Sequence, residues 1–89
     1  MREELIAAGL WEAHNPNNPS LSVTAAWQVL ARIGVACKYV GRTLEGDYEY
    51  LVYHRETGAS IASGRGKTAP LAMCQAALAA LHKNTADPN

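Results

Sequence analysis

One short stretch of the sequence, residues 64–68 (GRGKT), has residue types that could bind phosphate. A nucleotide-binding P-loop follows the pattern G-x-x-x-x-G-K-[ST], because a long backbone cradle must surround the phosphates before the lysine and the hydroxyl engage them. Gly66, Lys67 and Thr68 match the last three positions, but the first required glycine falls at Ile61. An 89-residue chain also has no room for the parallel sheet and second acidic motif of such enzymes. We therefore do not interpret the stretch as a nucleotide site.

Two other interpretations of residues 64–68 stay open. Free backbone N–H groups at the start of a helix, together with Arg65 and Lys67, would attract a phosphate or a carboxylate. Alternatively, Gly64 and Gly66 form a flexible turn between a strand and a helix, and the two charges are solvated.

The remaining chemically active side chains do not form a recognisable site. Cys37 and Cys74 lie among apolar neighbours, which predicts buried free thiols in a reducing compartment rather than a disulfide. The three histidines lack zinc-ligand spacing. The carboxylates are scattered over loops, turns and termini, whereas acid–base catalysis needs convergent titratable groups. We expect no enzymatic activity, no metal and no cofactor.

The composition indicates one small globular domain. Apolar residues make up 48% and charged residues 18% of the chain, which suffices for a core and is too little charge for a disordered protein. Eight basic residues balance eight acidic ones, so no global field attracts nucleic acid or an anionic membrane. No window approaches the ~20 apolar residues of a membrane span. We expect a cytoplasmic, single-domain protein over residues 1–89, with an N-terminal helix and loop at 1–19, a core at 20–83 and a frayed tail at 84–89.

The first and last helices are predicted from apolar spacing. Arg2–Ala13 can form a short helix, although Gly9 disfavours it, and the Pro- and Asn-rich loop at residues 14–20 follows. The last helix begins near Thr68, which can act as its N-cap, with Pro70 in the first turn. Its leucines form one stripe, while its alanines keep it thin enough to pack closely on a sheet.

The middle helix is predicted over Val23–Ile33. Ser22 can cap its start, and Gly34 can adopt the left-handed conformation that ends it. Trp27 lies within the apolar stripe, so we expect it to be the main core anchor of this helix rather than a platform for a ligand.

Between the helices the apolar period changes to two, which predicts strands. The strands are expected at Val35–Gly41, Tyr48–Glu56 and Ala59–Ser63, separated by tight turns. Tyr50 and its neighbouring tyrosines are expected to be half-buried supports, and a base-stacking platform is the alternative. The predicted fold class is α+β: a three-stranded antiparallel sheet with helices packed on it, in the order α-α-β-β-β-α, forming an α/β sandwich. Whether the helices cover one or both faces of the sheet stays open.

The order of elements resembles the double-stranded RNA-binding domain over Val23–Lys83. That family opens its final helix with several lysines aimed at phosphates, whereas only Lys67 matches here in type, and Pro70 and apolar residues occupy the first turn. The loop between the first two strands also lacks the expected proline and histidine. Nucleic-acid binding through the basic loop before the last helix is therefore the alternative function.

Two segments resemble small bacteriophage proteins of the phage ABA sandwich domain group. They are SLSVTAAWQVLARIG, residues 20–34, and ASGRGKTAPLAMCQAALAALH, residues 62–82, of which the second is the more specific. The resemblance covers about three quarters of the chain and implies an α/β sandwich encoded by a phage or prophage. It implies no activity, because the group is uncharacterised.

These considerations favour a non-enzymatic interaction protein of a phage or prophage. Such a protein would occupy the surface of a host protein, for example one of a defence system or of the transcription machinery, and inhibit it in the host cytoplasm. The expected contact residues lie in the loops at one end of the sheet and on an exposed tyrosine: Arg42, Tyr50, Arg65, Gly66 and Lys67. Open sheet edges in so small a domain also make a homodimer an expectation.

Overall fold

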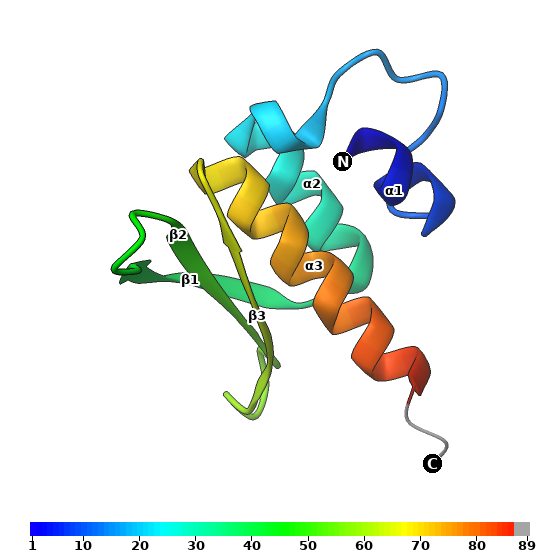
Figure 1. Ribbon diagram of the computed structural model, residues 1–89. Coiled ribbons are helices and arrows are strands. Elements are labelled where there is room, and N and C mark those ends of the chain that lie inside the picture. Colours follow the sequence, from blue (N-terminus) through cyan, green and yellow to red (C-terminus); the bar gives the residue numbers. More distant parts are fainter. Residues whose placement is uncertain (87–89) are drawn as a thin grey trace.

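The computed structural model describes the backbone of residues 1–86 and the side chains of residues 1–83 (Figure 1). An α+β fold with the helix and strand order α-α-β-β-β-α is confirmed. The elements are α1 (Arg2–Ala7), the 3₁₀ turn η1 (Pro19–Leu21), α2 (Val23–Ile33), β1 (Ala36–Arg42), β2 (Tyr48–Tyr53), β3 (Ser60–Gly66) and α3 (Ala69–Ala86). Of the predicted frayed tail, residues 84–86 belong to α3 and residues 87–89 lie outside the described part of the chain.

The three strands form one antiparallel sheet in the order β1-β2-β3. Tyr39 lies opposite Tyr50, and Tyr50 lies opposite Gly64. A register shift between Tyr39 and Gly41 leaves Val40 as an extra residue on β1, which is a β-bulge. Figure 1 shows the helices on one side of the sheet, so this fold leaves the other side without a helical layer.

The third strand is longer than predicted, because β3 continues through Gly64 and Gly66. These glycines face α3 at a distance that leaves no space for a side chain. A Cβ atom at Gly64 would clash with the backbone nitrogen of Ala76 and lie 2.7 Å from the carbonyl oxygen of Ala72. The interpretation of Gly64 and Gly66 as a flexible turn is therefore wrong: they are strand residues that allow a helix backbone to contact the sheet.

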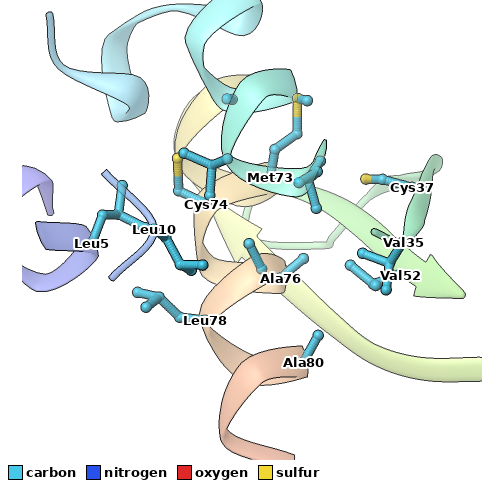
Figure 2. Close-up of a cluster of buried hydrophobic side chains, with 14 of the residues drawn as sticks. Leu5, Leu10, Val35, Cys37, Val52, Met73, Cys74, Ala76, Leu78 and Ala80 are labelled. Atoms are coloured by element: carbon cyan, nitrogen blue, oxygen red, sulfur yellow. The ribbon is translucent and has the colours of Figure 1, made fainter. Parts of the chain in front are cut away.

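Helix α3 lies between two groups of buried side chains (Figure 2). One side of the helix faces the sheet, and the other faces the N-terminal segment. Met73, Ala76 and Ala80 point toward Val35, Cys37 and Val52, whereas Cys74 and Leu78 point toward Leu5 and Leu10. A helix that is covered on two sides needs apolar residues on both, and α3 is apolar nearly all round. Its alanines allow the close packing on the sheet that we expected from the sequence.

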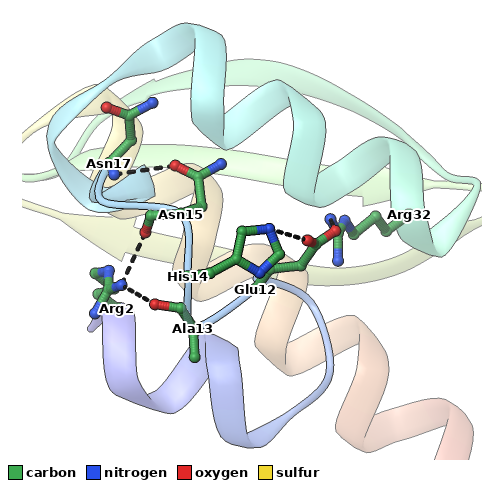
Figure 3. Close-up of polar contacts among 7 residues, drawn as sticks. All are labelled: Arg2, Glu12, Ala13, His14, Asn15, Asn17 and Arg32. Carbon is green, nitrogen blue, oxygen red and sulfur yellow. Dashed lines mark hydrogen bonds and ion pairs between the residues drawn. The ribbon is translucent and has the colours of Figure 1, made fainter.

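The first helix is shorter than predicted and ends at Ala7 instead of Ala13. Gly9 has a positive φ of 77°, which turns the chain out of the helix. The Arg2 guanidinium then fixes the returning segment by donating 2.8 Å hydrogen bonds to the carbonyl oxygens of Ala13 and Asn15 (Figure 3). The N-terminal layer is therefore a helix of six residues followed by an ordered loop.

Helix α2 has the predicted bounds and caps. The Ser22 hydroxyl accepts a 3.3 Å hydrogen bond from the backbone nitrogen of Ala25, and Gly34 ends the helix at φ 79°. The prediction for Trp27 is wrong, because this side chain is 46% exposed. Trp27 follows Ala26 by one residue, roughly 100° around the helix, and so lies beside the buried stripe rather than in it. Trp11, only 4% exposed, is the tryptophan of the core.

Both cysteines are free and buried, as predicted. Burial raises the pKa of Cys37 to about 11 and that of Cys74 to about 12. Both groups are therefore neutral thiols at physiological pH, and neither is an activated nucleophile.

Substitution of Gly64 by alanine is expected to destabilise the protein strongly. The added Cβ would force α3 away from β3, at a cost of about 3 kcal/mol in the free energy of unfolding, or roughly 15 °C in Tm. Urea denaturation followed by circular dichroism measures this change. Ser63→Ala is the matched control, because Ser63 is an exposed neighbour on the same strand, and it should leave the midpoint nearly unchanged. Equal midpoints for the two variants would contradict the packing described here.

The cysteine thiols are expected to be unreactive toward Ellman's reagent in the native protein at pH 8. The pKa of each thiol is raised from its ordinary value of 9.0, so the associated stability is fully present below pH 9 and is lost as the pH rises toward about 12. Denaturant should release both thiols at once. A Ser63→Cys variant provides an exposed control thiol, which should react immediately. Rapid native reaction of Cys37 or Cys74 would contradict their burial.

Candidate interaction surface

All five residues expected to bind a partner or an anion lie at one end of the sheet, beside the turn between β1 and β2. Arg42 lies opposite Tyr48, and Tyr48 lies opposite Gly66. Arg65 and Lys67 flank Gly66 in the chain, and Tyr50 is two residues along β2 from Tyr48. The structure thus brings together positions from all three strands.

The five residues are not equally accessible. Arg42, Arg65 and Lys67 are exposed, whereas Tyr50 is half-buried and Gly66 is buried under α3. A Cβ atom at Gly66 would lie 2.8 Å from the backbone nitrogen of Ala72, so the helix, and not solvent, covers this glycine. Gly66 therefore acts by letting α3 begin close to the sheet.

The start of α3 is capped by its own sequence, as predicted for Thr68. The Thr68 hydroxyl accepts a 3.4 Å hydrogen bond from the backbone nitrogen of Leu71, and the Thr68 carbonyl accepts a 3.0 Å bond from that of Ala72. One of the N–H groups that would cradle an anion, that of Leu71, is thus already bonded, and Pro70 beside it has no N–H group.

Carboxylates neutralise the cations of β3 and of the following turn. Lys67 Nζ lies 2.9 Å from Asp47 Oδ1, and Arg65 Nε lies 3.8 Å from Glu49 Oε1. Arg42 is different, because its guanidinium donates a 2.8 Å hydrogen bond to the carbonyl oxygen of Gly46 and lies 4.8 Å from the centroid of the Tyr48 ring. The local field at Lys67 and Arg65 is therefore weaker than their charges suggest.

Three tyrosines form a cluster beside Arg42. The ring centroid of Tyr39 lies 5.5 Å from that of Tyr50 and 6.2 Å from that of Tyr48, in tilted arrangements. Burial is the main cause that raises the pKa of Tyr50, followed by the neighbouring Cys37 and tyrosines. Tyr50 is half-buried and packs against the core, as expected, whereas Tyr39 is the solvent-exposed member of the cluster.

Large apolar side chains are exposed next to this cluster. Tyr39 is 51% exposed, Val40 is 54% exposed, and Leu44 in the β1–β2 turn is fully exposed. We call Tyr39, Val40, Arg42, Leu44 and Tyr48 the hairpin-end surface. Sequence reasoning named Arg42 and expected contacts in the loop at residues 42–47, which contains Leu44, and on an exposed tyrosine, but it did not mark Val40. The period-two pattern of β1 indicated which residues share a sheet face with Tyr39. It did not indicate that the end of β1 near the hairpin extends beyond the helices and is exposed.

A second exposed apolar group lies on η1 and α2, formed by Leu21, Val23 and Trp27. It has no aromatic cluster and no cation of its own in the contacts that the structure describes. The structure also contains a hollow of about 400 Å³ lined by Gly34 and by the exposed polar residues 54–57, which contribute no apolar side chain to it.

The N-terminal loop contains the one charged network seen in Figure 3. Glu12 Oε1 lies 2.7 Å from Arg32 Nη2, and Glu12 Oε2 lies 2.8 Å from His14 Nε2. The hydrogen bond from Arg32 is the main cause that lowers the pKa of Glu12, which makes this carboxylate a poor general base. The network ties the loop to α2.

Two properties of the described residues bear on function. Among them, no group of three or more histidine, cysteine, aspartate or glutamate side chains could hold a metal ion. No described helix combines the length and the apolar character that crossing a bilayer requires.

Comparison with known proteins shows the family. A family model described as the phage ABA sandwich domain matches residues 3–78, which is most of the chain. No curated protein and no solved structure gives a significant match. The matched family is not a known enzyme family. The match covers residues 3–7 of α1, all three strands and the glycine-to-alanine contact between β3 and α3, and the chain belongs to the phage ABA sandwich domain family.

Proposed function

We propose that this phage protein is a non-enzymatic interaction module that binds a host protein through the hairpin-end surface. The observation that carries the proposal is the exposure of Tyr39, Val40 and Leu44 beside Arg42. Exposed apolar groups of this kind mark interaction sites, and tyrosine and arginine are enriched among residues that dominate binding energy. A host target, such as a protein of a defence system or of the transcription machinery, fits the phage family, and its inhibition would follow from occupation of its surface in the host cytoplasm.

The chemistry of the titratable groups supports a binding role over catalysis. The carboxylates Glu12, Asp47 and Glu49 are each engaged by a cation. The two thiols are buried, with pKa values raised to about 11 and about 12. None of these groups has the free, poised character that acid–base or nucleophilic catalysis requires.

Nucleic-acid binding is the weaker alternative. It would depend on Arg65 and Lys67, whose charges are already paired with Glu49 and Asp47. A phosphate backbone would have to replace these ion pairs, and the neutral net charge of the chain supplies no further attraction.

The proposal predicts that the partner is lost when Leu44 is replaced by serine. The tagged protein is used to recover partners from host lysate, with and without nuclease, and the recovered proteins are identified by mass spectrometry. Truncation of an apolar anchor should weaken binding at least about tenfold. Leu21→Ser is the matched control, because Leu21 is a highly exposed leucine on η1, outside the hairpin-end surface.

The outcomes separate the two functions. Recovery of a stoichiometric protein that survives nuclease, is lost with Leu44→Ser and is kept with Leu21→Ser supports the proposal. Equal recovery with both variants would show that the hairpin-end surface is not the binding site. Recovery that nuclease abolishes would favour nucleic acid, with Arg65 and Lys67 as the contacts.

A further inference from the structure

The free edge of β1 offers unpaired backbone groups to a partner. In an antiparallel pair, residues that exchange hydrogen bonds alternate with residues that do not. The backbone nitrogen of Thr43 donates a 2.8 Å hydrogen bond to the carbonyl oxygen of Asp47, so Asp47 faces β1. Every second residue after Asp47 does the same, and the β2 residues bonded to β1 are therefore Glu49, Leu51 and Tyr53. The backbone nitrogen of His54, just after β2, donates a 2.9 Å hydrogen bond to the carbonyl oxygen of Ala59, just before β3. Counting back two residues at a time, Val52 and Tyr50 are the β2 residues whose backbone groups bond to β3, which agrees with the alternation found from β1.

Cys37 and Tyr39 are consequently the β1 residues whose N–H and C=O groups point away from the sheet. They lie opposite Val52 and Tyr50, the β2 residues bonded to β3. Among the described residues, the backbone hydrogen bonds of turns, loops and caps do not involve these groups. Figure 1 shows β1 running away from α2 toward the hairpin, and Lys38, Tyr39 and Val40 along it are exposed.

The same edge carries two exposed cations. Lys38 and Arg42 are exposed and form no ion pair with any described acidic group, in contrast to Arg65 and Lys67 on β3. Lys38 lies 6.0 Å from the ring centroid of Tyr53, on the face opposite the tyrosine cluster. Between the two cations lie Tyr39 and Val40, both about half exposed. Along the edge, two apolar side chains thus lie between the positive side chains of Lys38 and Arg42.

We infer that β1 is a docking edge for an acidic, extended segment of the partner protein, which adds to the sheet as a fourth strand. Backbone pairing with Cys37 and Tyr39 would supply affinity, and carboxylates opposite Lys38 and Arg42 would supply specificity by charge complementarity. An apolar residue of the segment would contact Tyr39. The inference rests on the proposed function and specifies the chemistry of the partner.

Synthetic peptides test the inference directly. The probe is a fluorescent peptide with the central sequence Glu-Thr-Val-Glu, whose two glutamates project from opposite faces of a strand, as Lys38 and Arg42 do on either side of the bulge at Val40. We expect it to bind at least about tenfold more tightly than the peptide with lysine in place of both glutamates. The amide hydrogens of Cys37 and Tyr39 should exchange more slowly in the complex, as measured by NMR.

Charge-removal variants provide the matched comparison. Lys38→Gln with Arg42→Gln should abolish the preference for the glutamate peptide, whereas Arg65→Gln with Lys67→Gln should keep it. Absence of binding, equal binding of both peptides, or unchanged exchange of the Cys37 and Tyr39 amides would overturn the inference. Preferential binding of a short oligonucleotide over the glutamate peptide would also overturn it.

The result can be separated from that of the lysate experiment. If a host protein is lost with Leu44→Ser while the glutamate peptide does not bind, the proposed function stands and the docking edge is wrong. If the recovered protein instead depends on Lys38 and Arg42 but not on Leu44, the docking edge is right and Leu44 is not a contact. Pairing of β1 with a second copy would appear as a dimer that the peptide dissociates, and a dimer that resists the peptide would count against the docking edge.

Discussion

The contact between the backbones of β3 and α3 is the constraint on which the rest of the structure depends. Gly64 and Gly66 remove the side chains that would separate them, and Ala72 and Ala76 keep the facing side of the helix small. Dispersion attraction grows steeply as surfaces approach, so this close contact contributes strongly to the core even though its side chains are small. In a chain of only 89 residues, close packing substitutes for the large apolar groups of bigger domains.

The position of α3 determines what the other elements can cover. Because the helix lies close to β3, its far side remains available to the N-terminal segment, where Leu5 and Leu10 pack against Leu78. Helix α2 occupies the space beside α3, and β1 then extends beyond both helices toward the hairpin. The open part of β1 and the exposed tyrosine cluster thus follow from the arrangement of the core.

Charge pairing divides the surface into two kinds of region. On β3 and the following turn, Arg65 and Lys67 are opposed by Glu49 and Asp47, whereas Lys38 and Arg42 on β1 lack such partners. Exposed ion pairs contribute little stability, but they reduce the charge that a partner encounters. The basic loop, which was the most conspicuous feature of the sequence, is therefore less available for binding than Lys38 and Arg42.

Much of the fold was predictable because its signals are local. The serine cap and glycine stop of α2, the period-two strands, the capped start of α3 and the buried cysteines depend on a few neighbouring residues, and the structure contains each of them. The family resemblance depended on the same segments. The five expected contact residues also lie at one end of the sheet, because hairpins of short strands bring their ends together.

What the sequence could not decide depends on contacts between distant residues. Helical spacing placed Trp27 within an apolar stripe, but the stripe that α2 buries is formed by Ala25, Ala26, Val29 and Leu30, so Trp27 is exposed, whereas Trp11 is buried. A glycine in a turn and a glycine beneath a helix have the same sequence signature, and only the position of Ala76 shows that Gly64 is the second kind. The bulge at Val40, the pairing of Lys67 with Asp47 and the free edge of β1 likewise follow from which strands and helices are neighbours. Local sequence determined the elements of this protein, and tertiary packing decided which of their residues remain exposed, because burial depends on what lies on the opposite side of each contact.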